Sequence, residues 1–208
     1  MLTRILHTIA SNPAVYDRLQ QLAGCKKSLA RLRPYLANAV GTVLDLGAGT
    51  GNYANIVAAP ARYIWLDNDT RKLRGFRSKF PKALAILGDA TSIPLKPKSV
   101  DLALCIAMSH HLADKEIGLL FHELAQVCRT RLIFLDPVQQ PTSRISNILW
   151  KYDRGSYPRS ASALRSMIGQ YFDIEQEEEY TIYHHYLLCS GRPKPNAGMP
   201  PASSGRRR

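Results

Sequence analysis

The chain has 208 residues, a formal net charge of +12, 45% hydrophobic residues and 21% charged residues. These proportions are typical of one globular domain with a full core, and they exclude a disordered or fibrous chain. No apolar stretch reaches the roughly 18 residues that a transmembrane helix needs, so we expect no membrane-spanning segment.

Residues 1–40 are predicted to be a helical extension before the first strand. Asn12 followed by Pro13 is a typical helix start. A second helical stretch is expected around 28–38, interrupted or kinked at Pro34.

The segment 43–53 reads Val-Leu-Asp-Leu-Gly-Ala-Gly-Thr-Gly-Asn-Tyr and dominates the pattern. It predicts a short buried strand, a glycine turn and a helix from Tyr53 to just before Pro60. This arrangement lets backbone N–H groups approach a nucleotide-like ligand. A dinucleotide fingerprint would need glycine or alanine at Asn52, so the residue found there argues against NAD. Asp45, in the strand, instead favours a ligand with an ammonium group.

Two further strands are predicted over 63–67 and 83–87. The first ends in Asp67, and the second is followed by Gly88 and Asp89. Asp45, Asp67 and Asp89 are each separated by 22 residues. Between the second and third strands, Thr70 is predicted to cap a helix over 71–80. A repeated strand–helix pattern places the three carboxylates along the carboxyl edge of a parallel sheet, where such folds bind ligands.

The series Asp45-x-Gly47-x-Gly49-x-Gly51, followed by Asp67 and Asp89, resembles class I S-adenosylmethionine (SAM) dependent methyltransferases of the small-molecule, type 11-like kind. The resemblance covers about 40–190. It implies an α/β fold, Rossmann-like with three αβα layers, a mostly parallel seven-stranded sheet in the order 3-2-1-4-5-7-6 and a C-terminal antiparallel hairpin. It implies SAM as cofactor. The implied cofactor-binding residues are Asp45, Gly47, Ala48, Gly49, Gly51, Asp67, Asn68, Asp89 and Ala90.

A fourth strand is predicted over 100–107, followed by His110 and His111 and by a helix capped by Asp114 that ends near 128. The resemblance implies that this histidine pair lies on the acceptor side, with His111 the catalytic candidate. His111 would orient the acceptor or take its proton, or it would only hydrogen-bond a neighbouring loop. Both histidines are substrate candidates, and Tyr16 joins them because the family's N-terminal helices close over the acceptor.

A fifth strand over 131–135, ending in Asp136, precedes an insertion at 139–160 with an apolar stripe at helical spacing. The stripe fits core packing, an acceptor lid or a membrane-surface patch, and Arg154 in the following loop is a further substrate candidate. A helix over 161–170 and strands over 172–180 and 182–190 complete the domain. His184, His185 and Tyr186 are predicted to open the last strand.

The domain is therefore expected to span 41–190, between the 1–40 helical cap and a disordered basic tail at 191–208. The tail contains five cations and no acid, so an anionic membrane or nucleic acid could contact it. Four scattered cysteines support neither a disulfide framework nor a metal site, and a cytoplasmic location is expected.

These observations predict a SAM-dependent methyltransferase that acts on a small-molecule or lipid-like acceptor. An RNA methyltransferase and a SAM-binding protein without catalysis are the alternatives. The methylated atom, whether O, N or C, and the oligomeric state are left open by the sequence.

Overall fold

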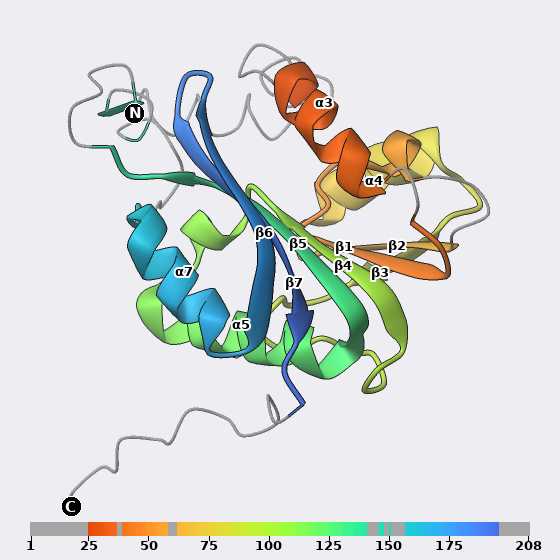
Figure 1. The fold of residues 1–208 in the computed structure, drawn as a ribbon. Coiled ribbons are helices and arrows are strands. Elements are labelled where there is room, and N and C mark those ends of the chain that lie inside the picture. The colour runs from red at the N-terminus through yellow and green to blue at the C-terminus, as the bar shows by residue number, and fades with distance from the viewer. Residues whose placement is uncertain are drawn as a thin grey trace, which may run out of the picture.

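The computed structural model describes residues 25–36, 39–57, 62–140, 146–147, 150 and 157–195. Its centre is a seven-stranded sheet in the order β3-β2-β1-β4-β5-β7-β6, which confirms the predicted fold class and strand order (Figure 1). The strands are β1 Thr42–Leu46, β2 Arg62–Asp67, β3 Leu84–Leu87, β4 Val100–Ile106, β5 Cys128–Val138, β6 Phe172–Thr181 and β7 His185–Pro193.

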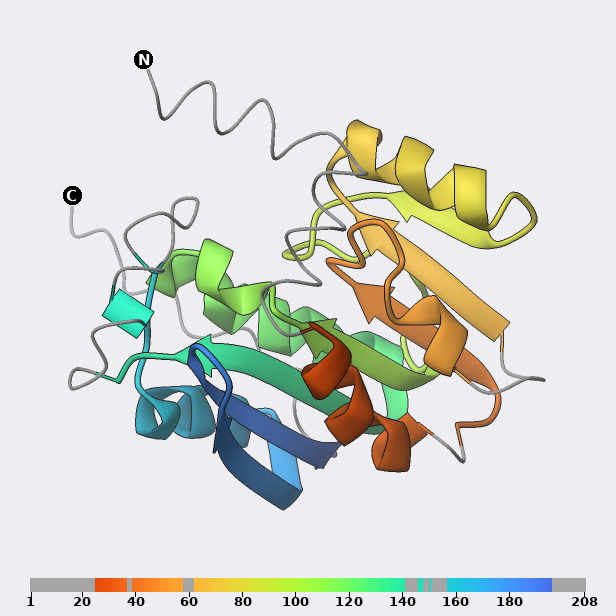
Figure 2. The ribbon, with the colours of Figure 1, turned by 90° about the horizontal axis from the view of Figure 1, so that it is seen from above.

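Strands β1 to β5 run parallel, and β7 pairs antiparallel with both β5 and β6. The carboxyl ends of the five parallel strands therefore meet at one edge of the sheet, which is visible from above in Figure 2. Of the residues that the structure describes, none belongs to a helix long and apolar enough to cross a membrane.

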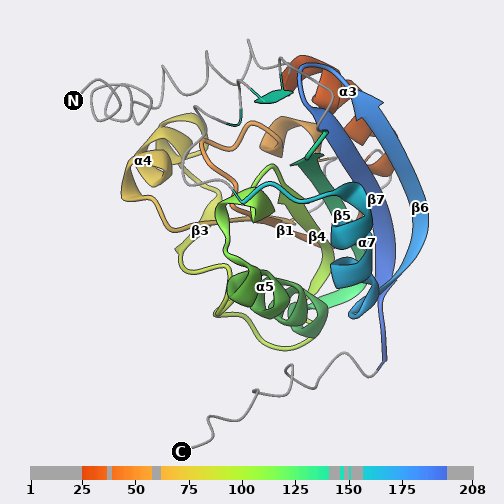
Figure 3. The same ribbon diagram turned by 90° about the vertical axis from the view of Figure 1, so that its left-hand side faces the viewer.

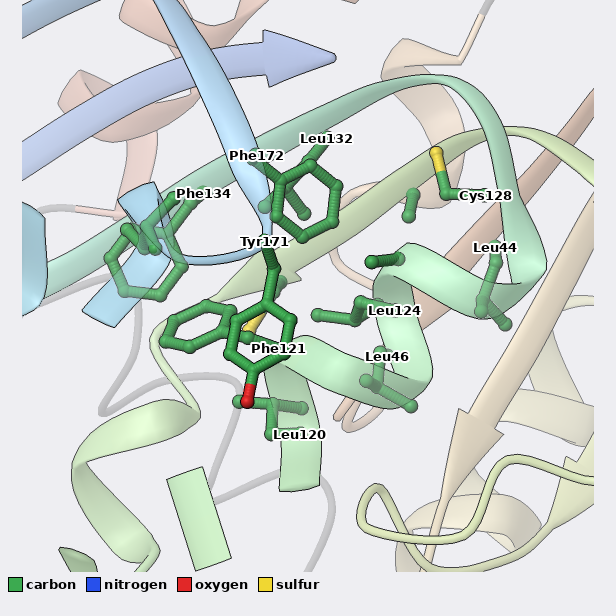
Figure 4. Packing of buried hydrophobic residues seen from close by; sticks show 14 of the residues in the cluster. Leu44, Leu46, Leu120, Phe121, Leu124, Cys128, Leu132, Phe134, Tyr171 and Phe172 are labelled. Carbon is green, nitrogen blue, oxygen red and sulfur yellow. The ribbon is translucent and has the colours of Figure 1, made fainter. Parts of the chain in front are cut away.

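One face of the sheet is covered by α5 Asp114–Val127 and α7 Ala161–Gly169. Apolar residues of α5 recur at 117, 120, 121 and 124, the spacing that puts them on one side of a helix. They pack on the sheet together with Leu44, Leu46 and Phe134 (Figure 4), and the Phe121 and Phe134 rings lie 5.6 Å apart.

The opposite face carries α3 Cys25–Leu36, the 3-10 turn η1 Ala54–Ile56 and α4 Thr70–Lys79 (Figure 3). Leu32 and Leu36 of α3 are fully buried against β4 and β5. Phe76 of α4 stacks on Trp65 of β2 with ring centroids 5.5 Å apart, and this contact holds α4 on the sheet.

The prediction of a helix from Tyr53 to Pro60 is wrong in the described part of that segment. Only the three-residue turn η1 forms, and Val57 is extended. No side chain caps this turn, and the short stretch includes asparagine and β-branched residues, which favour helices weakly.

Both predicted helix caps are shifted by one residue. Asp69, rather than Thr70, caps α4, because its side chain accepts from the Arg71 N–H at 2.8 Å. Asp114 is the first residue of α5, and Ala113 is the cap; its N–H donates to Glu116 at 2.8 Å. Each carboxylate satisfies an N–H group that the start of a helix leaves unpaired.

The predicted boundary of the C-terminal tail at 191 is also corrected. Strand β7 continues to Pro193, and Gly191 pairs with Leu132 of β5. Beyond the strand, the Lys194 N–H donates to the Tyr171 carbonyl at 2.9 Å. Residues 191–195 are thus part of the fold, while 196–208 lie outside the described residues.

We predict that deleting 196–208 leaves the Tm unchanged, because that segment has few apolar residues to bury. Deleting 191–208 should lower the Tm by roughly 4 °C or more, since ladder hydrogen bonds worth about 1 kcal/mol each are lost. Thermal melts of the two truncated chains beside the full chain test this. Equal melting temperatures for both truncations would contradict it.

Candidate functional site

The glycine turn lies at the carboxyl edge of the sheet, directly after β1. The Gly47 and Ala48 N–H groups donate to the Leu66 carbonyl of β2 at 2.8 and 3.2 Å. All three glycines have positive φ angles, from 57° to 79°, a conformation that side chains disfavour. A Cβ atom at Gly47 would also clash with the Met108 side chain. The turn therefore requires glycine, and Met108 links it to the segment after β4.

Asp67, at the end of β2, supports the glycine turn through a hydrogen bond to its backbone. Its side chain is 5% exposed; Oδ2 accepts from the Gly49 N–H at 2.9 Å, and Oδ1 accepts from the Asp69 N–H at 3.0 Å. Lys72 Nζ lies 3.7 Å from Oδ2. The Trp65 indole donates to the Gly49 carbonyl at 2.7 Å, a support that sequence reasoning missed.

Asp45 lies buried inside the same edge, and the Tyr63 hydroxyl donates to its Oδ2. Burial raises the pKa of Asp45 to about 7; the Tyr63 hydrogen bond opposes this rise and the negative charge of Asp67 adds to it. Burial, followed by the nearby Asp45 charge, also raises the pKa of Tyr63 well above its ordinary value. The carboxylate predicted to face an ammonium group is thus covered by a tyrosine.

The remaining predicted cofactor residues lie near this edge but are more exposed to solvent. Asn68 and Asp89 are exposed, and Ala90 is half-buried. Asp89 Oδ1 accepts from the N–H and hydroxyl of Thr91 at 2.8 and 2.9 Å. The Gly88 N–H donates to the Asp67 carbonyl at 3.1 Å, which joins the ends of β2 and β3. The third acid therefore follows the same edge as the other two.

The segment after β4 places His110 and His111 in different environments. His110 is 6% exposed, and its Nδ1 lies 2.6 Å from Asp136 Oδ1 of β5. Asp136 Oδ2 also accepts from the His110 N–H, at 2.9 Å, and from the Ser109 hydroxyl. Because a carboxylate only accepts, the contact requires the proton on Nδ1 and leaves Nε2 of the neutral ring as an acceptor.

His111 is exposed, although its ring centroid is only 4.1 Å from that of His110. Trp150 packs edge-on against His110 at 5.8 Å and against His184 at 4.8 Å. His184 was predicted to open the last strand, but β7 begins at His185, and His184 lies in the preceding turn. An aromatic cluster thus lies at the end of β4, beside the glycine turn.

Arg159 was missed by sequence reasoning and organises this segment. The guanidinium is buried, donates to Asp114 Oδ1 at 2.7 and 3.0 Å, and donates to the Leu112 carbonyl at 2.7 Å and the Ser109 carbonyl at 3.3 Å. It fixes the loop after β4 to the start of α5. Two other predicted substrate residues, Tyr16 and Arg154, lie outside the described residues, as does the whole of the predicted apolar stripe.

Asp136 was noted in the sequence only as a strand end, and no role was predicted for it. The signal was present, because Asp136 follows the apolar core of β5 as Asp67 follows that of β2. No group of three or more histidine, cysteine or acidic side chains that could hold a metal ion occurs within the described ranges.

We predict that Asp45 makes the free protein less stable as the pH rises. Its folded pKa of about 7 lies above the ordinary 3.8, so the folded state binds the proton more tightly. The stabilisation is complete below about pH 4 and is lost as the pH rises through 7. Between pH 5 and 8, the Tm should fall more for the wild type than for Asp45→Asn. Identical pH profiles for both proteins would contradict this, and Asp173→Asn, an exposed acid, is the control.

Residues 43–131 match a family model described as "Methyltransferase domain". An uncharacterised methyltransferase-like protein of Schizosaccharomyces pombe is 38% identical over 84 residues, which cover 39% of this chain and 33% of that protein. An uncharacterised methyltransferase of Bacillus mycoides is 29% identical over 102 residues, 47% of this chain and 48% of that protein. The match thus spans about a third to a half of these curated relatives.

Solved structures agree in fold. Magnesium protoporphyrin IX methyltransferase from Synechocystis, with bound SAH, has a TM-score of 0.71 at 16% identity, covering 92% of this chain and 99% of that one. The PH0226 protein from Pyrococcus horikoshii has a TM-score of 0.69 at 18% identity, covering 81% and 91%. The solved structures show that the chain has the Rossmann-like fold, and residues 43–131 are similar to the methyltransferase domain family.

Proposed function

We propose that the chain transfers a methyl group from SAM to a small-molecule or lipid-like acceptor. The observation that carries this proposal is the glycine turn, which lies over the buried Asp67 carboxylate at the carboxyl edge of the sheet. The Synechocystis methyltransferase of similar fold, which was solved with bound SAM and with bound SAH, supports the choice of cofactor.

The residues at this edge fit the parts of SAM. A carboxylate offers about four lone-pair sites, and Asp67 uses one on each oxygen for N–H groups, so it can still accept from a ribose diol. Asp45, once ionised, suits the ammonium group. The glycine N–H groups suit the carboxylate of the amino-acid part. Asn68, Asp89 and Ala90 follow along the edge toward the adenine.

Bound SAM would supply a methyl group already activated for in-line displacement by its positive sulfur. The protein then has mainly to position the acceptor and remove its proton. We assign His110 as the general base: its Nε2 takes the proton from an O–H or N–H group of the acceptor. The Asp136 carboxylate, 2.6 Å from Nδ1, balances the charge that the ring gains.

This assignment differs from the sequence-based choice of His111 as the catalytic residue. The buried contact to Asp136 supports His110, because it holds one tautomer and one ring orientation. His111 is exposed beside it and keeps the role of an acceptor contact. Trp150 and His184 supply flat surfaces in the same cluster, which suits an acceptor with an apolar body.

We predict that Asp67→Ala weakens SAM binding by about 1–3 kcal/mol, the usual value of a hydrogen bond to a charged acceptor. Isothermal calorimetry with SAM, and with NAD as a comparison ligand, measures this. Asp173→Ala is the matched control at an exposed acid, and thermal melts establish that each variant is folded. Unchanged SAM affinity in a folded Asp67→Ala protein would remove Asp67 from the site.

The acceptor prediction uses methyl-labelled SAM and fractionated cell extract, with label sorted into lipid, RNA, protein and small-molecule pools. His110→Ala and Asp136→Asn should lower labelling by roughly 10²–10⁴-fold, the usual contribution of general acid–base catalysis, with SAM affinity retained. His111→Ala should lower it less, and His122→Ala on α5 should not lower it. Wild-type labelling by His110→Ala would show that His110 takes no proton.

A further inference from the structure

Positive charge is concentrated on one edge of the molecule. From the start of α4 to the end of β3, residues 70–87, there are six cations and no acid. They are Arg71, Lys72, Arg74, Arg77, Lys79 and Lys82. By contrast, α5 on the opposite face contains three acids and one lysine. α3 also contains four cations and no acid, so the excess belongs to the side of the sheet that carries α3 and α4. We call the α4 and β3 part of it the α4–β3 surface.

Only part of this charge is neutralised by neighbouring acids. Half-buried Asp69 pairs with Arg71 at 3.2 Å, and Lys72 lies 3.7 Å from Asp67. Arg74 and Lys82 are exposed, and no ion pair joins either of them to a described carboxylate. Arg77 donates to the Ala83 carbonyl, which ties the end of α4 to the start of β3. The basic helix and the edge strand thus present one continuous surface.

The same surface exposes aliphatic side chains. β3 is the edge strand of the sheet, and Leu84 and Leu87 are each 49% exposed. They point to opposite faces of the strand, and Leu87 is on the face on which α4 packs. The large aromatic rings nearby, Trp65 and Phe76, are fully buried beneath α4. Single-stranded nucleic acid is typically bound by exposed aromatic rings that stack on bases. Cations beside exposed leucine instead match an anionic lipid surface. Its headgroups attract the cations, and its acyl region buries apolar side chains.

We propose that the α4–β3 surface docks on membranes that contain anionic phospholipid. α4 begins three residues after Asp67, so docking would bring the candidate site close to the lipid. The proposal does not rest on methyl transfer, because docking is measured without SAM. It gives the methyltransferase domain a surface for reaching a lipid-like acceptor.

The test is co-sedimentation of the full chain with vesicles of 70% phosphatidylcholine and 30% phosphatidylglycerol, and with pure phosphatidylcholine. We expect binding to the anionic vesicles only, and loss of most of it between 50 and 300 mM NaCl. Arg74→Glu should lower affinity about fivefold and Arg74→Glu with Lys82→Glu about 25-fold, following the typical contribution of one basic residue near an anionic membrane.

Leu87→Ser should lower vesicle affinity about threefold without changing the affinity for heparin. Lys115→Glu on α5 is the matched control and should stay within twofold of the wild type, and thermal melts establish that all variants are folded. The proposal is overturned if the wild type does not bind anionic vesicles at 50 mM NaCl, or if the double charge reversal binds within twofold. It is also overturned if the leucine variant is unchanged while poly(U) RNA binds as tightly as vesicles.

Discussion

The site depends on the way the backbone of a single residue, Gly49, is held in place. Its N–H donates to buried Asp67, and its carbonyl accepts from the Trp65 indole. Both partners belong to β2, so the turn that follows β1 is fixed by the neighbouring strand. Glycine has no side-chain contacts with which to hold a positive φ angle, and hydrogen bonds in a dry environment provide this rigidity. A ligand that approaches the turn meets a backbone already in place.

Two acids with the same strand-end pattern acquire different chemistry through this arrangement. Asp67 accepts hydrogen bonds from two backbone N–H groups. Asp45 has one hydroxyl partner and full burial, so its pKa rises to about 7. The fixed charge of Asp67 adds to that rise. Burial of Asp45, with the nearby Asp67 charge, therefore makes this carboxyl sensitive to pH near neutrality.

The sequence was sufficient for the sheet and for the place of Asp45, Asp67 and Asp89 at its carboxyl edge, because these depend on local patterns: apolar strands, glycine spacing and acids at strand ends. It failed where partners are distant in the chain. His110 and His111 differ only through Asp136, 26 residues later, and Arg159 reaches Asp114 across 45 residues. The helix expected after Tyr53 failed for a local reason, since nothing caps it. The weak helix propensities of residues 55–57 could have reduced that expectation. No local pattern could have revealed the contacts of Arg159.

The two edges of the sheet are protected in different ways, and this difference bears on function. On β6, a row of glutamates pairs with flanking cations: Glu175 with Arg192 at 2.7 Å and Glu177 with Arg165 at 2.9 Å. Charge on an edge strand discourages pairing with other chains, and here it is also neutralised within the fold. Beside β3, Arg74 and Lys82 form no ion pair with an acid among the described residues, and leucines are exposed. An edge strand needs only some charge or a covering element to avoid pairing with another chain. The cations without acidic partners exceed this requirement, so they favour a partner of opposite charge.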